Sequence, residues 1–280
     1  MKSDMYRLSR NVGLYVSPLM ATFLIAQEAF GIGLVEIISG EAKNHCVEFF
    51  NMTVYFSPLM LLTPFLASIP YAAVFCEDAN SGYLQFALHR NVYLKAYTRT
   101  KYFAVWTSGF LVISIPLMVF GIICVAFAAP YTELYVLENG NQLKDTAWEI
   151  LGTVFDGKAV IFSQIFFFSC FSASCSVIAL AASAYLPNPF FTWCFPVILA
   201  YGGNFLFSKL HLGFLNLYYS FDPVYDVLHF SSDTAGILYM LAYHATVFLV
   251  CYVLFYLGVK RRVGGGELRI CVDANKKMEA

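Results

Sequence analysis

The chain has 280 residues, of which 59% are hydrophobic and only 12% are charged. Soluble globular domains are about 45–50% apolar, so this composition excludes an ordinary soluble domain and predicts a polytopic membrane protein. The formal net charge of −1 and the lack of a basic arm give no indication of a nucleic-acid partner.

Long apolar segments recur along the chain, and about 20 apolar residues suffice for a helix to cross a bilayer. We expect one all-α membrane domain over residues 1–280, with six spans at 13–38, 53–75, 102–128, 159–186, 190–207 and 235–259. The basic clusters fall before the first span, between the second and third, and after the sixth, and short basic loops stay in the cytoplasm. This pattern predicts a plasma-membrane protein with cytoplasmic termini, including a tail at 260–280.

Residues 1–12 are expected to form a short amphipathic helix on the inner leaflet, followed directly by the first span. That span contains Gln27 and Glu28, and Glu28 lies near its middle. A carboxyl group at mid-membrane costs about 2.5–3.5 kcal/mol on insertion scales, so it should face a bundle interior, a water-filled cavity or a partner subunit. Two interpretations stay open for Glu28: a residue of a substrate path or helix interface, and a protonated packing residue.

The second span carries prolines at positions 58, 64 and 70. Proline removes a backbone donor and kinks a helix, which a membrane bundle tolerates. The pattern predicts a bent span, although Pro58 is also consistent with a simple span start.

The polar segment 76–101 joins the second span to the third. Ser81 and Gly82 interrupt it, and the apolar residues from Tyr83 onward recur three and four apart, which predicts a short amphipathic helix. Its apolar stripe either binds a partner protein or lies on the inner leaflet with its basic residues against anionic lipid.

The same segment carries, in order, Glu77, Asp78, Ser81, Gly82, Leu84, a basic residue at Arg90 or Arg99, and Lys101 at the entry to the next span. This order resembles the cytosolic loop of ABC-2 type permeases, the membrane subunits of ATP-binding cassette exporters. Tyr83 stands where that family usually has a small Thr, and the family's Pro-Ser-Arg turn is missing. The resemblance implies an ATPase-coupling site made of Glu77, Asp78, Ser81, Gly82, Tyr83, Leu84, Phe86 and Leu88. It also implies an elbow helix at 1–12, a re-entrant element between the last two spans, and pairing with a second copy or a related permease.

The fourth span holds Gln164 and a run of small residues that favours close contact between helices. Gln164, Gln27 and Glu28 are the candidate substrate-path residues. A Pro-Asn-Pro turn at 187–189 separates this span from the fifth. In the acidic loop at 131–158, a small helix is predicted, either as a lid over the outer mouth or as an interfacial helix anchored by Trp148.

The link at 208–234 is too short to cross the membrane twice and is predicted to be re-entrant or interfacial. Asp222, Asp226 and His229 share one helix face there. Such a face suits a divalent cation, but capping by Asp222 and a favourable helix dipole at Asp226 explain two of the three residues, and no metal site is assigned. The cysteines are interpreted as packing residues.

No GxxxxGK[ST] phosphate loop occurs, so the chain has no cofactor of its own, and ATP and Mg²⁺ would belong to separate ATPase subunits. The function expected from the resemblance is a non-enzymatic permease that exports an amphipathic substrate, for which a peptide is the first choice. The alternatives are an ATP-independent channel or secondary carrier, and a membrane enzyme that uses Asp222, Asp226 and His229.

Overall fold

A computed structural model describes residues 2–39, 45–89, 93–128, 148, 157–221 and 233–264, and every regular element among them is a helix. Five of these helices are long and apolar enough to cross a membrane: α2 (Gly13–Ile32), α8 (Leu94–Phe127), α11 (Gly157–Ser183), α12 (Pro189–Lys209) and α14 (Asp233–Gly264). A sixth crossing results if α4 (Cys46–Phe56) and α5 (Leu59–Ser68) form one bent span. The chain is therefore an all-α, multi-pass membrane protein, as its composition predicts.

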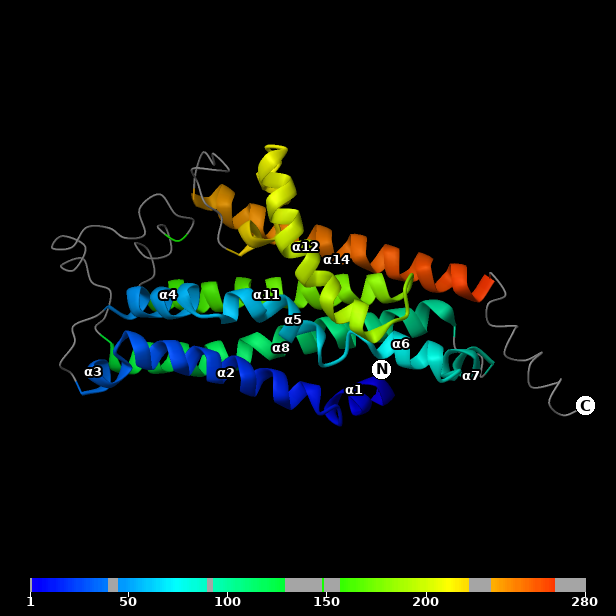
Figure 1. Cartoon of the computed structure of the whole chain (residues 1–280), viewed down its shortest axis with the longest axis horizontal. Helices are drawn as coiled ribbons and strands as arrows, with labels where there is room; N and C mark the ends of the chain where they lie inside the picture. Colours follow the sequence, from blue (N-terminus) through cyan, green and yellow to red (C-terminus); the bar gives the residue numbers. More distant parts are fainter. Residues whose placement is uncertain are drawn as a thin grey trace, which may run out of the picture.

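The short helices gather at the two ends of the bundle (Figure 1). At one end lie α1 (Lys2–Ser9), α6 (Val74–Asn80), α7 (Tyr83–His89) and the end of α14. At the other end lie α3 (Leu34–Ile38) and the start of α4. The elements predicted to be cytoplasmic thus share one end, and the membrane side that this end faces stays a prediction.

The helix α11 is the centre of the bundle. In the most apolar stretch of α11, 89% of the residues are buried; the corresponding share is 17% for α12 and 11% for α14. Small side chains allow this close contact: Ser172 Oγ donates to the Gly109 carbonyl of α8 at 2.7 Å, and Ser176 Oγ donates to the Ala67 carbonyl of α5 at 2.6 Å. The predicted helix-contact role of the small residues in the fourth span is confirmed.

The predicted second span consists of two helices, as its prolines suggest. It begins at Cys46, before the predicted residue 53, and α4 and α5 are bent by 67° about Ser57 and Pro58. Ser57 Oγ accepts from Leu59 N at 3.0 Å and donates to the Leu24 carbonyl of α2 at 3.4 Å, so it caps α5 and ties the bend to the first span. Pro58 marks the bend and is also the N-cap residue from which α5 starts, so the structure agrees with both interpretations of this proline.

Other boundaries differ from the prediction in smaller ways. The first span ends at Gly33, whose φ of 115° breaks the helix before α3. The helix α8 begins at Leu94, ahead of the predicted span start at residue 102, because the polar residues 94–101 belong to the same continuous helix. Asn188 Oδ1 caps α12 by accepting from Phe190 N at 3.0 Å, which confirms the turn predicted there.

The described part of the link after α12 contains two 3₁₀ helices, η1 (Gly213–Leu215) and η2 (Leu217–Ser220). Two tyrosines of α14 hold η1: Tyr239 Oη donates to the Phe214 carbonyl at 2.8 Å, and Tyr243 Oη donates to the Leu215 carbonyl at 3.0 Å. The predicted residues Asp222, Asp226 and His229 lie outside the described residues.

In the acidic loop at 131–158, the structure describes Trp148 and the last two residues, which open α11. Trp148 is buried and its ring lies 5.9 Å from that of Phe167. The seven described cysteines are free thiols, and all but Cys194 are buried, as expected of packing residues.

Candidate functional site

The turn between α6 and α7 presents a small surface at one end of the bundle. Ser81 N donates to the Glu77 carbonyl and ends α6, and Gly82 follows with φ of 72°, a conformation that favours glycine. In α7, Leu84 is buried, whereas Tyr83 and Phe86 are 40% and 56% exposed. The predicted break and short amphipathic helix are confirmed, and this helix shows aromatic surface at the end of the bundle.

Five charged residues meet directly behind this turn and are called here the charge cluster: Asp4, Arg7, Glu77, Asp78 and Lys101. The carboxylate of Asp78 is fully buried at its centre. One of its oxygens lies 2.7 Å from Lys101 Nζ, and the other accepts from Arg7 Nη1 at 2.8 Å. These contacts join α1, α6 and α8, three helices far apart in sequence.

The lysine is buried as deeply as its partner. Lys101 is 1% exposed, and Asp4 Oδ1 lies 2.9 Å from its Nζ, so the amine bridges two carboxylates. Burying a charge is costly unless it is paired, and these short contacts supply the pairing. Asp4 thereby fixes the amphipathic lead-in helix α1 against the base of α8.

Aromatic groups line the charge cluster. Tyr97 Oη donates to Asp78 Oδ2 at 2.8 Å, and the rings of Tyr71, Tyr83 and Tyr97 lie 5.7, 5.8 and 5.6 Å from Lys101 Nζ. The guanidinium of Arg7 lies over Tyr83 at 5.2 Å. Cations over aromatic faces gain electrostatic stabilisation. The exposed surface of α7 is thus connected through Tyr83 to the buried charges.

Within the charge cluster, the negative charge of Asp78 favours the charged form of Arg7. Burial alone would lower the pKa of the Arg7 guanidinium, but the hydrogen bond and the negative charge of Asp78 outweigh burial, and the pKa is raised. Arg7 therefore stays charged over the whole working pH range.

Of the predicted coupling residues, the structure brings Glu77, Asp78 and Tyr83 into or against the charge cluster, and Ser81 and Gly82 form the turn. Phe86 and Leu84 lie on opposite sides of α7, one exposed and one buried. The side chain of Leu88 is outside the described residues. Sequence reasoning missed Asp4, Arg7 and Tyr97 as partners of the coupling residues. Asp4 was a usable signal, because an acidic residue inside a basic lead-in helix indicates a cationic partner.

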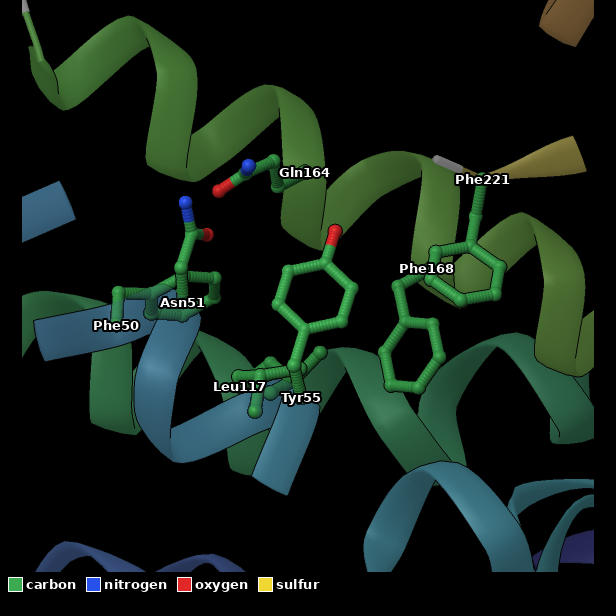
Figure 2. Close-up of a pocket in the computed structure, with 8 residues that line it drawn as sticks. Phe50, Asn51, Tyr55, Leu117, Gln164, Phe168 and Phe221 are labelled. Atoms are coloured by element: carbon green, nitrogen blue, oxygen red, sulfur yellow. The ribbon is translucent and has the colours of Figure 1, made fainter. Parts of the chain in front are cut away.

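The predicted substrate-path residues do not share one place. Gln27 is exposed on α2 and Glu28 is partly exposed. Gln164 is buried in α11, beside a void of about 10 Å³ that is also lined by Asn51 and Tyr55. Figure 2 shows the amide groups of Asn51 and Gln164 turned toward each other across this space. A void of this size has room for about one water molecule and not for a transported substrate.

A larger cavity of about 420 Å³ lies at the bend of the second span. Its walls come from both halves of the bend, from α12 and from η2, and they contain Tyr55, Ser57, Met60, Leu61, Tyr201, Asn204, Asn216, Tyr218 and Tyr219. Sequence reasoning did not find this cavity, because its walls meet only once the chain is bent at Pro58 and η2 returns toward α12.

The chain matches no protein-family model, no curated protein and no solved structure. Its function is therefore argued from its own residues.

Proposed function

We propose that the protein is the membrane-embedded permease subunit of an ATP-driven exporter of the ABC-2 type, in the plasma membrane of a bacterium. In this proposal, separate ATPase subunits bind the surface around α7, two permease subunits complete the transporter, and an amphipathic substrate crosses the membrane. The permease itself holds no nucleotide and performs no hydrolysis.

The observation that carries the proposal is the attachment of α7 to the bundle. The helix exposes Tyr83 and Phe86 at the end where α1 and α6 also lie, while the residue just before its turn, Asp78, is buried and bonded to α1 and α8 (Figure 1). A surface helix with aromatic groups outside and a rigid ionic base is suited to receive a protein partner.

A force on α7 has a short route into the membrane part. The contact of Arg7 with Asp78 is a charge-assisted hydrogen bond, the stronger kind, and Lys101 Nζ forms an ion pair with Asp78 at 2.7 Å. Lys101 belongs to α8, and α8 packs along the central helix α11 through Gly109 and Ser172. Displacement of α6 and α7 would therefore shift α1 and α8 together and move α8 against α11.

The test is co-purification in mild detergent from the source cells, followed by measurement of ATP hydrolysis. We expect an ATPase carrying a phosphate loop to co-purify, and Phe86→Glu to abolish the association. The matched control is Tyr6→Glu, because Tyr6 is also 56% exposed, on another short helix at the same end. Association that is lost equally in both variants would point to a general charge effect and overturn the assignment of α7.

A second experiment separates the proposal from the channel or carrier alternative. The purified permease is reconstituted in vesicles with and without the co-purified ATPase and ATP, and efflux of a labelled amphipathic peptide is followed. We expect transport only with both. Transport by the permease alone would identify an ATP-independent channel or carrier.

A further inference from the structure

The cavity at the bend of the second span has no role in the charge cluster and lies between different elements. Tyr55, Ser57, Met60 and Leu61 line it on both sides of the bend, Tyr201 and Asn204 face it from α12, and the rest comes from Asn216 and η2. Its volume of about 420 Å³ falls within the range of about 300–1,000 Å³ that is usual for small-molecule sites. The space is therefore large enough for a ligand.

The chemistry of the walls is aromatic and polar but uncharged. Four tyrosines contribute ring faces and phenol groups, and no Asp, Glu, Lys, Arg or His is among the described residues that line the cavity. Aromatic rings with a polar tip bind molecules that have both an apolar part and a hydrogen-bonding part. A charged group brought into such a site would lose hydration without gaining a counter-charge, which is costly.

The polar groups of the walls divide into those already used and those that remain for a ligand. Asn216 is 1% exposed; it donates to Asn204 Oδ1 at 2.6 Å and accepts from Tyr218 N at 3.1 Å, so it holds η2 in place. Tyr201 Oη donates to the Leu61 carbonyl at 2.8 Å and ties α12 to the bend. Asn204 is exposed and lines the cavity, so its amide nitrogen is accessible to a ligand while its Oδ1 accepts from Asn216.

From these observations we propose that the cavity binds an uncharged molecule with aromatic or aliphatic surface and a few hydrogen-bonding groups. Asn204 supplies the amide contact, and Tyr55, Tyr201 and Tyr219 supply ring faces. If the protein is the exporter proposed above, this molecule is the cargo or the part of the cargo that the permease recognises; the binding itself does not depend on that function.

The site also depends on the bend. Because α4 and α5 both contribute walls and Ser57 caps the bend, straightening the second span would change the shape of the cavity. Occupation by a ligand therefore stabilises the bent form, and this links binding to the conformation of the span.

The test uses benzophenone as a neutral photoprobe, with its 4-carboxylate and its 4-trimethylammonium derivative as charged probes. The purified permease is labelled in lipid nanodiscs without nucleotide, and the labelled residues are mapped by mass spectrometry. We expect saturable labelling of Met60 by the neutral probe, suppressed at least 10-fold by excess benzhydrol. Met52 is the internal control, because it is 40% exposed and does not line the cavity; its labelling should not saturate.

A pair of variants tests whether the cavity prefers uncharged ligands. Asn204→Asp should shift the labelling of Met60 from the neutral probe to the trimethylammonium probe. Gly202→Asp adds the same charge on the same helix, at an exposed position with open space around it, and should leave the labelling unchanged. The proposal is overturned if Met60 is labelled no more than Met52, or if the charged probes label the unaltered cavity as well as the neutral one. Because no ATPase is present, these outcomes are independent of whether an ATPase partner exists.

Discussion

Lys101 Nζ lies 2.7 Å from Asp78 Oδ2, and both side chains are almost completely removed from solvent. One residue comes from the foot of a membrane-spanning helix and the other from the short helix that leads into α7. A buried ion pair at this position makes the attachment of α7 depend on charge, and that dependence can be tested.

Removal of the lysine charge should destabilise the protein strongly. In Lys101→Met, Asp4 and Asp78 lose their shared cation and stay buried, and breaking a buried pair in this way costs about 3–5 kcal/mol. Thermal unfolding in detergent measures the loss. Lys95→Met on the same helix is the control, because Lys95 is exposed and its change should be within about 0.5 kcal/mol of the unaltered protein.

A second variant shows whether the effect belongs to the pair. Asp78→Asn combined with Lys101→Met should cost less than the sum of the two single changes, since each removes the partner of the other. Additive losses, or a Lys101→Met variant as stable as Lys95→Met, would contradict a coupled charge cluster.

Gly109→Ala should force α8 away from α11. A methyl group at Gly109 would overlap Ser176 Oγ and lie 3.2 Å from Ala173 Cα, and the second contact is with backbone. Overpacking of this kind costs about 1–3 kcal/mol. The midpoint of thermal unfolding should fall, whereas Gly202→Ala, which has open space, should leave it unchanged. Equal unfolding midpoints for the two variants would contradict close packing of α8 against α11 at Gly109.

Gly82→Ala should strain the turn before α7 without any steric clash. Nothing lies within 4 Å of the added methyl group, but φ is 72°, and a left-handed backbone costs an L-residue about 1–2 kcal/mol. We expect faster hydrogen exchange in α7, measured by mass spectrometry. Gly82→Asn should exchange more slowly than Gly82→Ala, because Asn visits this conformation more readily. The reverse order would argue against the positive φ.

Arg262 should stabilise the contact between the end of α14 and the end of α11. Its Nε donates to the Ala184 carbonyl at 2.6 Å and its Nη2 donates to the Tyr185 carbonyl at 2.7 Å, so one guanidinium joins the ends of α14 and α11. A hydrogen bond to a charged group contributes about 1.5–3 kcal/mol, and Arg262→Met should lose at least one such contribution in chemical unfolding. The neighbouring exposed residue provides the control, since Arg261→Met should have little effect.

Much of the fold could be predicted because membrane spans are encoded locally. A long apolar run has few alternatives to a helix in lipid, where every backbone group must be bonded within the segment. The turn at Asn188, the contact face rich in serine and the break at Gly82 are likewise local signals, and each was found in the chain itself. The bend at Pro58 was predicted in kind, but its place within the span was not.

The partners of charged residues were much harder to predict. Asp78 was selected as a coupling residue, yet nothing near it in sequence indicates that Arg7 and Lys101 would surround it. Gln164 was selected because a polar residue in an apolar run is conspicuous, and the structure encloses it beside a void that is too small for a substrate. Contacts across many residues depend on which helix faces meet, and that depends on the packing of the whole bundle.

The sequence alone therefore determined the class of the protein: an apolar chain whose helices cross a membrane several times, with a short amphipathic helix between its second and third crossings. Only the tertiary structure decided that the base of this helix is a buried charge cluster, and that a cavity of about 420 Å³ with uncharged described walls lies at a bend. The reason is physical: hydrophobicity and helix-breaking residues act over a few neighbouring positions, whereas ion pairs and cavities arise between surfaces that folding brings together.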